Sequence, residues 1–469
     1  MKLRKILTRI GIVLLAAVAV VLVVRAVLNF TEGRALARAL AELKAKGIPL
    51  TAQDLTPPCP DEDNGARLWK AFENTVTIPG RQTGVPGRSI PLDKAVRGRR
   101  RAAAAAGIVI SRAWTDFTAG KPLAPADRAA IKDVILQNAK PLELVAELGD
   151  KPCFLYRDPA QSLIESLPPD AIQMIQTTKL LFFSSLFSAE DGDVNGAITK
   201  LVSGLKFTPL MAREGTLIAF LISLADTRIL SQALVEVCRG KSLEDTDLIR
   251  LIGIQDPSPW RERLAAAFRG ERVLFIEAGQ YGLQGDLRDL GSVFEGSNWL
   301  RSLGLWIIRP LLKRDVRQAL PSFEFLETQA KVPYYQSRDV LRARDRQLKE
   351  RPWYAFLSNM MISDSEAAFM KEAMLEATML TSRAGLACRL YQSRTGRYPE
   401  SLEELVPGIL AEVPIDPFTG KPLVYRREGE GFIVYSLGSN QKDDGGRSTY
   451  MITQLVMDKD DDWTWKEDR

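Results

Sequence analysis

Histidine is absent from the 469 residues of the chain. A Ser/His/Asp triad, a Cys/His dyad, an HExxH zinc site and a histidine pH switch are therefore excluded within it. Cysteine is scarce: the four cysteines lie far apart, form no CxxC pair and show no spacing typical of metal ligands. Since no other catalytic signature stands out, we favour a non-enzymatic role.

Acidic side chains are missing from the first 30 residues, which contain five of the 63 basic residues. The rest of the chain holds the 58 acidic residues and an equal number of basic ones, so it has no net charge. A nucleic-acid-binding protein needs a marked excess of Lys and Arg to neutralise phosphates. We therefore expect no nucleic-acid partner and assign the excess charge to the N-terminal segment.

Residues 10–30 form a long apolar run, IGIVLLAAVAVVLVVRAVLNF, in which Arg25 is the one charged residue. At about 1.5 Å per residue, a helix of this length spans roughly 30 Å, the thickness of a hydrocarbon core. Arg25 is close enough to the end of the run to snorkel to the interface. We expect a single-pass anchor, with the lipid bilayer as the partner of residues 10–30.

The charges around the anchor predict its orientation. Basic residues precede the run without an acid, whereas Glu32 and Glu42 dilute the basic residues after it. The positive-inside rule favours a cytoplasmic N-terminus and an extracytoplasmic (periplasmic) body at the bacterial inner membrane. The alternative is a signal peptide cleaved at Ala17-Val18-Ala19, which would leave VVLVV exposed at the start of the mature chain, so we favour an uncleaved signal-anchor.

The four cysteines fall into two kinds of context. Cys59 in PPCP and Cys153 in KPCF lie in loop-like segments, where an extracytoplasmic location allows a disulfide. Cys238 and Cys388 lie in apolar helical patterns and are interpreted as core residues. A bridge and four unpaired cysteines both remain open, and the sequence favours the second.

We predict a mainly α fold in four regions. These are a cytoplasmic tip and transmembrane anchor (1–30), a helical region with Pro/Gly-rich loops (31–165), an all-α core (166–362) and a small α+β domain (363–469). The apolar runs LLFFSSLF and LIAFLISLA in the core region are under half the length of a membrane span. They therefore predict buried helices.

Several local motifs have a structural and a functional interpretation. Residues 191–198, DGDVNGAI, match half of an EF-hand loop, but Val202 stands where a bidentate Glu is needed, so we favour a turn between two helices. Ser203 and Lys206 fit S-x-x-K, but an S-D-N companion is absent, so we favour a coincidence. The basic cluster 94–101 could contact lipid, but we favour a solvated helix start. The Trp- and Arg-rich segment 299–314 could also contact lipid, but we favour packing in the core.

The C-terminal region combines a long helix with a hairpin. Ser363-x-x-Glu366 is a capping box that opens a helix to about Arg394, and the strand-like runs PLVYRR and GFIVYSLG flank an EGEG turn. The helix carries a heptad-like apolar seam made of Met370, Met374, Ala377, Thr381, Ala384, Cys388 and Tyr391. We expect helix and sheet to pack together as one unit.

This arrangement resembles the C-terminal domain of the major (G-type) pseudopilin of type II secretion systems, in which a long helix, a GRYP-like turn, a VP-x-DP motif and a YSLG strand end follow in this order. The chain as a whole resembles bacterial single-pass membrane-anchored proteins with a large helical body. A pseudopilin processing site is not expected, because IVLLA follows Gly11 without an acid. The matching residues are Tyr391, Gly396, Arg397, Tyr398, Pro399, Leu402, Leu405, Val413, Pro414, Asp416, Pro417, Gly420, Pro422, Tyr425, Tyr435, Ser436, Leu437 and Gly438.

The resemblance also implies a calcium ion, because the loop after YSLG binds calcium in pseudopilins of this type. The corresponding stretch here offers hard oxygen donors. The candidate ligands are Asn440, Asp443, Asp444 and Asp458, with Asp460 and Asp462 nearby.

Three functions remain open from the sequence. The first is a membrane-anchored extracytoplasmic scaffold or interaction protein with an envelope protein as partner. The second is a hydrolase or transferase with a Ser/Lys or carboxylate site in the helical core. The third is an accessory component of a type II secretion-like apparatus.

The topology is directly testable. A reporter that is active only outside the cytoplasm, fused after Arg469, is expected to be active, since the basic residues precede the apolar run. Activity of a matched cytoplasmic reporter at the same position would overturn the predicted location of the body.

Overall fold

The computed structural model describes residues 2–55, 58–79, 94–158, 160–166, 170–284, 298–362, 364–446 and 463–467. The predicted mainly helical architecture is confirmed. The helices are α1 (Lys2–Ala45), α2 (Ala66–Thr75), α3 (Lys94–Thr118), α4 (Pro125–Gln137), α5 (Ala139–Gly149), α6 (Ala171–Glu190), α7 (Val194–Phe207), α8 (Leu217–Cys238), α9 (Asp245–Ile254), α10 (Pro259–Gln284), α11 (Asn298–Gln329), α12 (Tyr334–Leu348), α13 (Phe356–Met361) and α14 (Ser365–Thr395).

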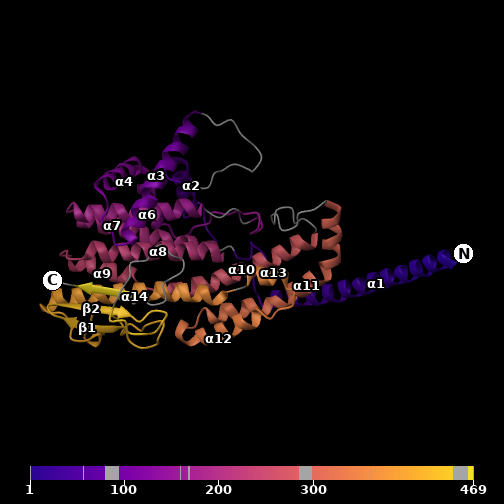
Figure 1. The fold of residues 1–469 in the computed structure, drawn as a ribbon. Helices are drawn as coiled ribbons and strands as arrows, with labels where there is room; N and C mark the ends of the chain where they lie inside the picture. Colours follow the sequence, from indigo (N-terminus) through magenta and orange to yellow (C-terminus); the bar gives the residue numbers. More distant parts are fainter. Residues whose placement is uncertain are drawn as a thin grey trace.

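Helix α1 projects far beyond the rest of the molecule (Figure 1). Its apolar residues from Ile10 onward are exposed, and it is long and apolar enough to cross a membrane. The helix passes without a break through residue 30, the expected boundary of the anchor, and Leu36 and Leu43 are buried in the body. Helix α8 is also long and apolar enough, but 61% of its apolar window is buried, as predicted for a core helix.

Two hydrophobic clusters make up most of the core. The first joins α2 to α9 with the second half of α14 and the sheet, and the second joins the end of α1 with α10 to α13 and the first half of α14. Figure 1 shows α14 between the helical body and the sheet. Apolar contacts therefore cross the expected domain boundary at residue 363 along the whole of α14.

The predicted hairpin is present, and a third strand joins it. Strands β1 (Val424–Glu428) and β2 (Gly431–Ser436) pair antiparallel, with Tyr425 opposite Val434. Strand β3 (Trp463–Glu467), which the sequence analysis missed, pairs antiparallel with β2. Strand β3 has no clear strand pattern in the sequence, because it is short and follows an acidic stretch.

The start of α14 differs from the predicted capping box. The helix begins at Ser365, and Asp345 of α12 accepts hydrogen bonds from the Ser365 hydroxyl (2.7 Å) and the Glu366 amide (2.9 Å). The Glu366 carboxylate turns instead to the Tyr334 hydroxyl and to Arg342. The expected Ser363 lies outside the described residues. A neighbouring helix thus supplies the cap.

Cys59 and Cys153 form a disulfide, so the prediction of four unpaired cysteines was wrong. The bridge joins the loop before α2 to the loop after α5, where the Gly65 amide also donates to the Cys153 carbonyl (3.0 Å). Cys238 and Cys388 are fully buried, as predicted for core residues, and burial raises the pKa of both thiols, that of Cys238 to about 12.

The contact between α14 and β3 depends on a glycine. A Cβ at Gly385 would lie 2.4 Å from the ring of the buried Trp465. Gly385→Ala is therefore expected to lower the free energy of unfolding by about 1–3 kcal/mol, the usual cost of overpacking. Thermal melting of the full chain in detergent measures the effect.

Gly253→Ala is the matched control, because a Cβ at Gly253 of α9 meets no atom within 4 Å. Its melting temperature is expected to stay within about a degree of the parent. Equal effects of the two substitutions would contradict the described packing of β3 on α14.

Candidate functional site

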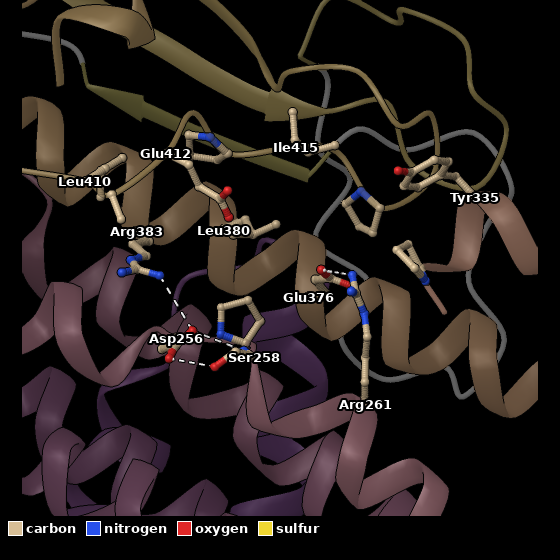
Figure 2. A pocket seen from close by; sticks show the side chains of 15 residues that line it. Asp256, Ser258, Arg261, Tyr335, Glu376, Leu380, Arg383, Leu410, Glu412 and Ile415 are labelled. Carbon is tan, nitrogen blue, oxygen red and sulfur yellow. Dashed lines mark hydrogen bonds and ion pairs between the residues drawn. The ribbon is translucent and has the colours of Figure 1, made fainter. Parts of the chain in front are cut away.

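A cavity of about 350 Å³ opens where the start of α10, the middle of α14 and the segment 410–417 meet (Figure 2). We call it the α14 pocket. It is lined by Asp256, Pro257, Ser258, Arg261, Pro333, Tyr335, Glu376, Leu380, Arg383, Leu410, Ala411, Glu412, Pro414, Ile415 and Pro417.

Buried Asp416 fixes the wall of the pocket that comes from segment 410–417. Its carboxylate accepts hydrogen bonds from the Phe418 amide (2.9 Å), the Ser436 hydroxyl (3.0 Å) and the Leu437 amide (3.0 Å). These bonds hold the VPIDP motif against the YSLG end of β2. Two motifs that carry the pseudopilin resemblance are thus in direct contact. Their order in the sequence does not require this contact.

Close packing fixes the same wall from the side of α12. Gly420 has a φ of +71°, and a Cβ there would lie 2.7 Å from the Tyr335 ring. The Tyr334 ring packs edge-on against Phe418, with centroids 5.7 Å apart. Glycine at 420 therefore satisfies both the left-handed backbone and the close approach of α12.

Glu372 and Glu376 are four residues apart on α14, so both side chains lie on one face of the helix. Arg261 donates to one oxygen of Glu376 at 2.6 Å, as Figure 2 shows. The other Glu376 oxygen and one Glu372 oxygen are buried and have no hydrogen-bond partner among the described residues. One guanidinium thus faces two buried carboxyl groups.

Burial disfavours the charged form of both carboxyl groups and raises the pKa of each. The neighbouring Glu376 adds to the effect on Glu372, whose pKa is raised to about 8. Arg261 opposes the shift at Glu376. The pair therefore holds a proton at neutral pH, with Glu372 as its site.

Three further polar residues of the lining contact one another. The Ser258 hydroxyl donates to Asp256 at 2.8 Å, and Arg383 lies 3.6 Å from the same carboxylate. Among the lining residues, the pocket thus presents both signs of charge beside proline rings and the Tyr335 ring. This lining suits the binding of a polar or charged group.

The structure gives Ser203 and Lys206 separate partners. The Ser203 hydroxyl donates to the Thr199 carbonyl (2.9 Å), and the Lys206 ammonium donates to Asp150 (2.6 Å). Both residues line the place where α5 approaches α7, because a Cβ at Gly149 would lie 2.8 Å from the Ser203 carbonyl oxygen. Their spacing serves helix packing.

The DGDVNGAI segment forms the predicted turn. Gly192 has a φ of +93°, and the Asp193 side chain accepts from the Gly196 amide at 2.9 Å at the start of α7. Asp191 at the end of α6 pairs with Lys132 at 2.7 Å. The basic cluster 94–101 opens α3, as expected for a helix start, but the side chains of residues 94–100 lie outside the described part.

The predicted calcium ligands are described in part. Asp443 accepts from the Tyr435 hydroxyl (2.8 Å) and the Gly445 amide (2.9 Å), while Asp444 accepts from the Asn440 amide nitrogen (2.8 Å). Asp458, Asp460 and Asp462 lie outside the described residues. Within the described ranges, no group of three or more His, Cys, Asp or Glu residues could hold a metal. Because Asp458 lies outside the described residues, the calcium site stays a prediction.

The sequence analysis named Pro414 and Pro417, which line the pocket, but missed the charged residues of the pocket and the neighbouring Glu372. The sequence indicates a buried acidic pair only weakly at Glu372 and Glu376, because two acids with helical spacing lie on a helix that is otherwise apolar on most sides. The sequence does not indicate Arg261 at all, because it is 115 residues away along the chain. The tertiary fold alone brings α10 against α14.

Comparisons of the chain with protein-family models, with curated proteins and with solved structures find no match. The function is therefore argued from the geometry and from the motifs of the C-terminal region.

The raised pKa of Glu372 predicts a pH-dependent stability. Between the ordinary glutamate pKa of 4.5 and the folded value of about 8, the unfolded chain has lost a proton that the folded chain keeps. The free energy of unfolding therefore falls as pH rises, by on the order of 1 kcal/mol per pH unit. Urea unfolding at pH 5 to 8 is expected to show a smaller fall in Glu372→Gln.

The matched control is Glu403→Gln, since Glu403 is exposed and its pKa is lowered by a hydrogen bond to Ser401. This variant is expected to keep the decline of the parent between pH 5 and pH 8. An equally steep decline in Glu372→Gln would contradict the assignment of the proton to Glu372.

Proposed function

We propose that the protein is a membrane-anchored extracytoplasmic interaction protein, in which the α14 pocket binds a segment of an envelope protein. Residues 10–30 hold it in the bacterial inner membrane, with the N-terminus in the cytoplasm. The observation that carries the proposal is the unbroken passage of α1 from an exposed apolar helix into the core of the body.

The disulfide supports the location of the body. Disulfides persist in oxidising compartments and are rare in the cytosol. The Cys59–Cys153 bridge closes a loop of 94 residues within the body, whereas the remaining two cysteines are buried. This division of the cysteines suits a body outside the cytoplasm.

The pocket supports an interaction role. Its wall includes Pro414 and Pro417, and Glu412 and Ile415 lie at the same wall (Figure 2). Fixed proline rings beside charges of both signs offer a preformed surface for an extended polypeptide with a charged side chain. We therefore expect a protein segment as the ligand.

The place of the pseudopilin-like motifs favours one class of partner. The VPIDP motif builds the pocket wall, so the residues that carry the resemblance also line the candidate site. An accessory role in a type II secretion-like apparatus is therefore our second candidate, with the same pocket as contact surface.

A photocrosslinking amino acid at Ile415 tests the proposal in cells. Ile415 lines the pocket and is 38% exposed, so a bound segment would lie within reach. We expect a discrete crosslinked product in the membrane fraction, reduced at least five-fold when Glu412→Lys reverses the charge beside it.

The matched control is the same amino acid at Ile249, which is 51% exposed on α9 and does not line the pocket. It is expected not to give this product. Identical products from both positions, or a product insensitive to Glu412→Lys, would contradict the role of the pocket.

A further inference from the structure

The side chain of Arg25, in the apolar run 10–30, contacts helix α11. Its guanidinium lies 3.3 Å from the centre of the Trp306 ring of α11. Its Nε and Nη2 donate to the Trp306 carbonyl at 2.9 and 2.7 Å. A residue in the apolar run 10–30 is thus covered by a helix of the body, 281 residues away along the chain.

Proline at 310 explains why this carbonyl is free to accept. In an α-helix the Trp306 carbonyl would bond the amide of residue 310, but Pro310 lies inside α11 and has no N–H. Arg25 supplies the missing donors. Proline also bends a helix, and Figure 1 shows the first turns of α11 running across the direction of α1 and the rest running along it.

Beyond the bend, α11 and α1 run in the same direction and are joined by polar contacts. Lys313 donates to the Asn29 side chain at 2.8 Å, and Gly33 leaves room for its ammonium group. Glu32 pairs with Arg314 (2.6 Å) and Arg317 (3.1 Å). These contacts fix the height of α11 along α1.

The position of α11 along α1 determines the depth in a bilayer at which the start of α11 would lie. Arg25 lies five residues before the end of the apolar run, which is about 8 Å along a helix. Trp306, at the level of Arg25, is 36% exposed, and Ile307 beside it is 53% exposed. With residues 10–30 in a bilayer, these exposed apolar side chains face lipid at the depth where headgroups meet acyl chains.

The charges at the same place are positive. Arg25 and Arg309 both lie close enough to Lys313 to repel it, and the Arg309 Nε is buried without a partner among the described residues. The nearby Glu32 is already paired with two other arginines. This cluster of three cations suits the phosphate of a phospholipid.

We propose that residues 298–309 are a second membrane contact: a helix that lies in the outer-leaflet interface beside the anchor, with Arg25, Arg309 and Lys313 binding a phospholipid phosphate. The proposal rests on the anchor of the proposed function. It adds that the bilayer holds the body in one orientation, because the contact lies to one side of α1.

Single labelled cysteines in the full chain test the depth. The native cysteines are expected not to react with the label, since Cys59 and Cys153 are bridged and Cys238 and Cys388 are fully buried. A bimane label is placed by Ile307→Cys, by Val18→Cys in the anchor and by Leu136→Cys on α4, all at exposed positions. Each protein is reconstituted in vesicles of phosphatidylethanolamine and phosphatidylglycerol (3:1) with a lipid carrying a doxyl quencher at acyl carbon 5.

We expect the label at 307 to be quenched by the doxyl lipid at least three-fold more than the label at 136, and aqueous iodide to show the reverse order. Quenching at 307 equal to that at 136 would overturn the proposal if the label at 18 is shielded from iodide. A label at 18 open to iodide would instead overturn the anchor itself.

The phosphate site is tested by native mass spectrometry of the full chain from mild detergent. A retained phospholipid is expected, with the bound fraction reduced at least five-fold in Arg309→Gln and unchanged in Arg346→Gln, an exposed arginine of α12. A parent without bound lipid, or equal retention in both variants, would overturn the role of the cation cluster.

Discussion

The burial of α14 on nearly all sides is the constraint on which the rest of the structure depends. Its first half belongs to the cluster with α10 to α13, and its second half belongs to the cluster with α2 to α9 and the sheet. A polar contact reinforces this position: the buried Arg389 donates to the Cys238 carbonyl at 2.6 Å and to the Lys241 carbonyl, which satisfies the end of α8. A helix so placed has to present small residues where partners come close, and Gly385 under Trp465 is such a place.

The same burial creates the candidate site. Glu372 and Glu376 lie on the face of α14 that meets α10, so their carboxyl groups lose water and find one guanidinium, that of Arg261. A buried ion pair of this kind adds little net stability, because desolvation offsets the attraction. Arg261 and Glu376 also line the adjoining α14 pocket. Asp416 holds the VPIDP loop, which forms one wall of the pocket, against the end of β2.

The N-terminal end of the molecule is constrained in a different way. A transmembrane helix joined to a body by a flexible linker leaves the body free to turn. Here α1 enters the second cluster directly, and polar contacts with α11 tie the two helices from Arg25 to Arg317. The body is thus held at a fixed height and rotation relative to α1. The α14 pocket therefore keeps a constant position relative to α1.

The sequence by itself determined the features that depend on local pattern. The apolar run of α1, the buried helices α6 and α8, the turn at Gly192 and the β1–β2 hairpin all follow from periodicity, length and turn residues. Tertiary structure alone decided the features that join distant segments. These are the cap of α14 by Asp345, the disulfide, strand β3, the cover of Arg25 by Trp306, and the meeting of Arg261 with Glu376. The reason is physical: hydrogen bonds and ion pairs across the fold depend on which faces are buried together, and no spacing along the chain encodes that choice.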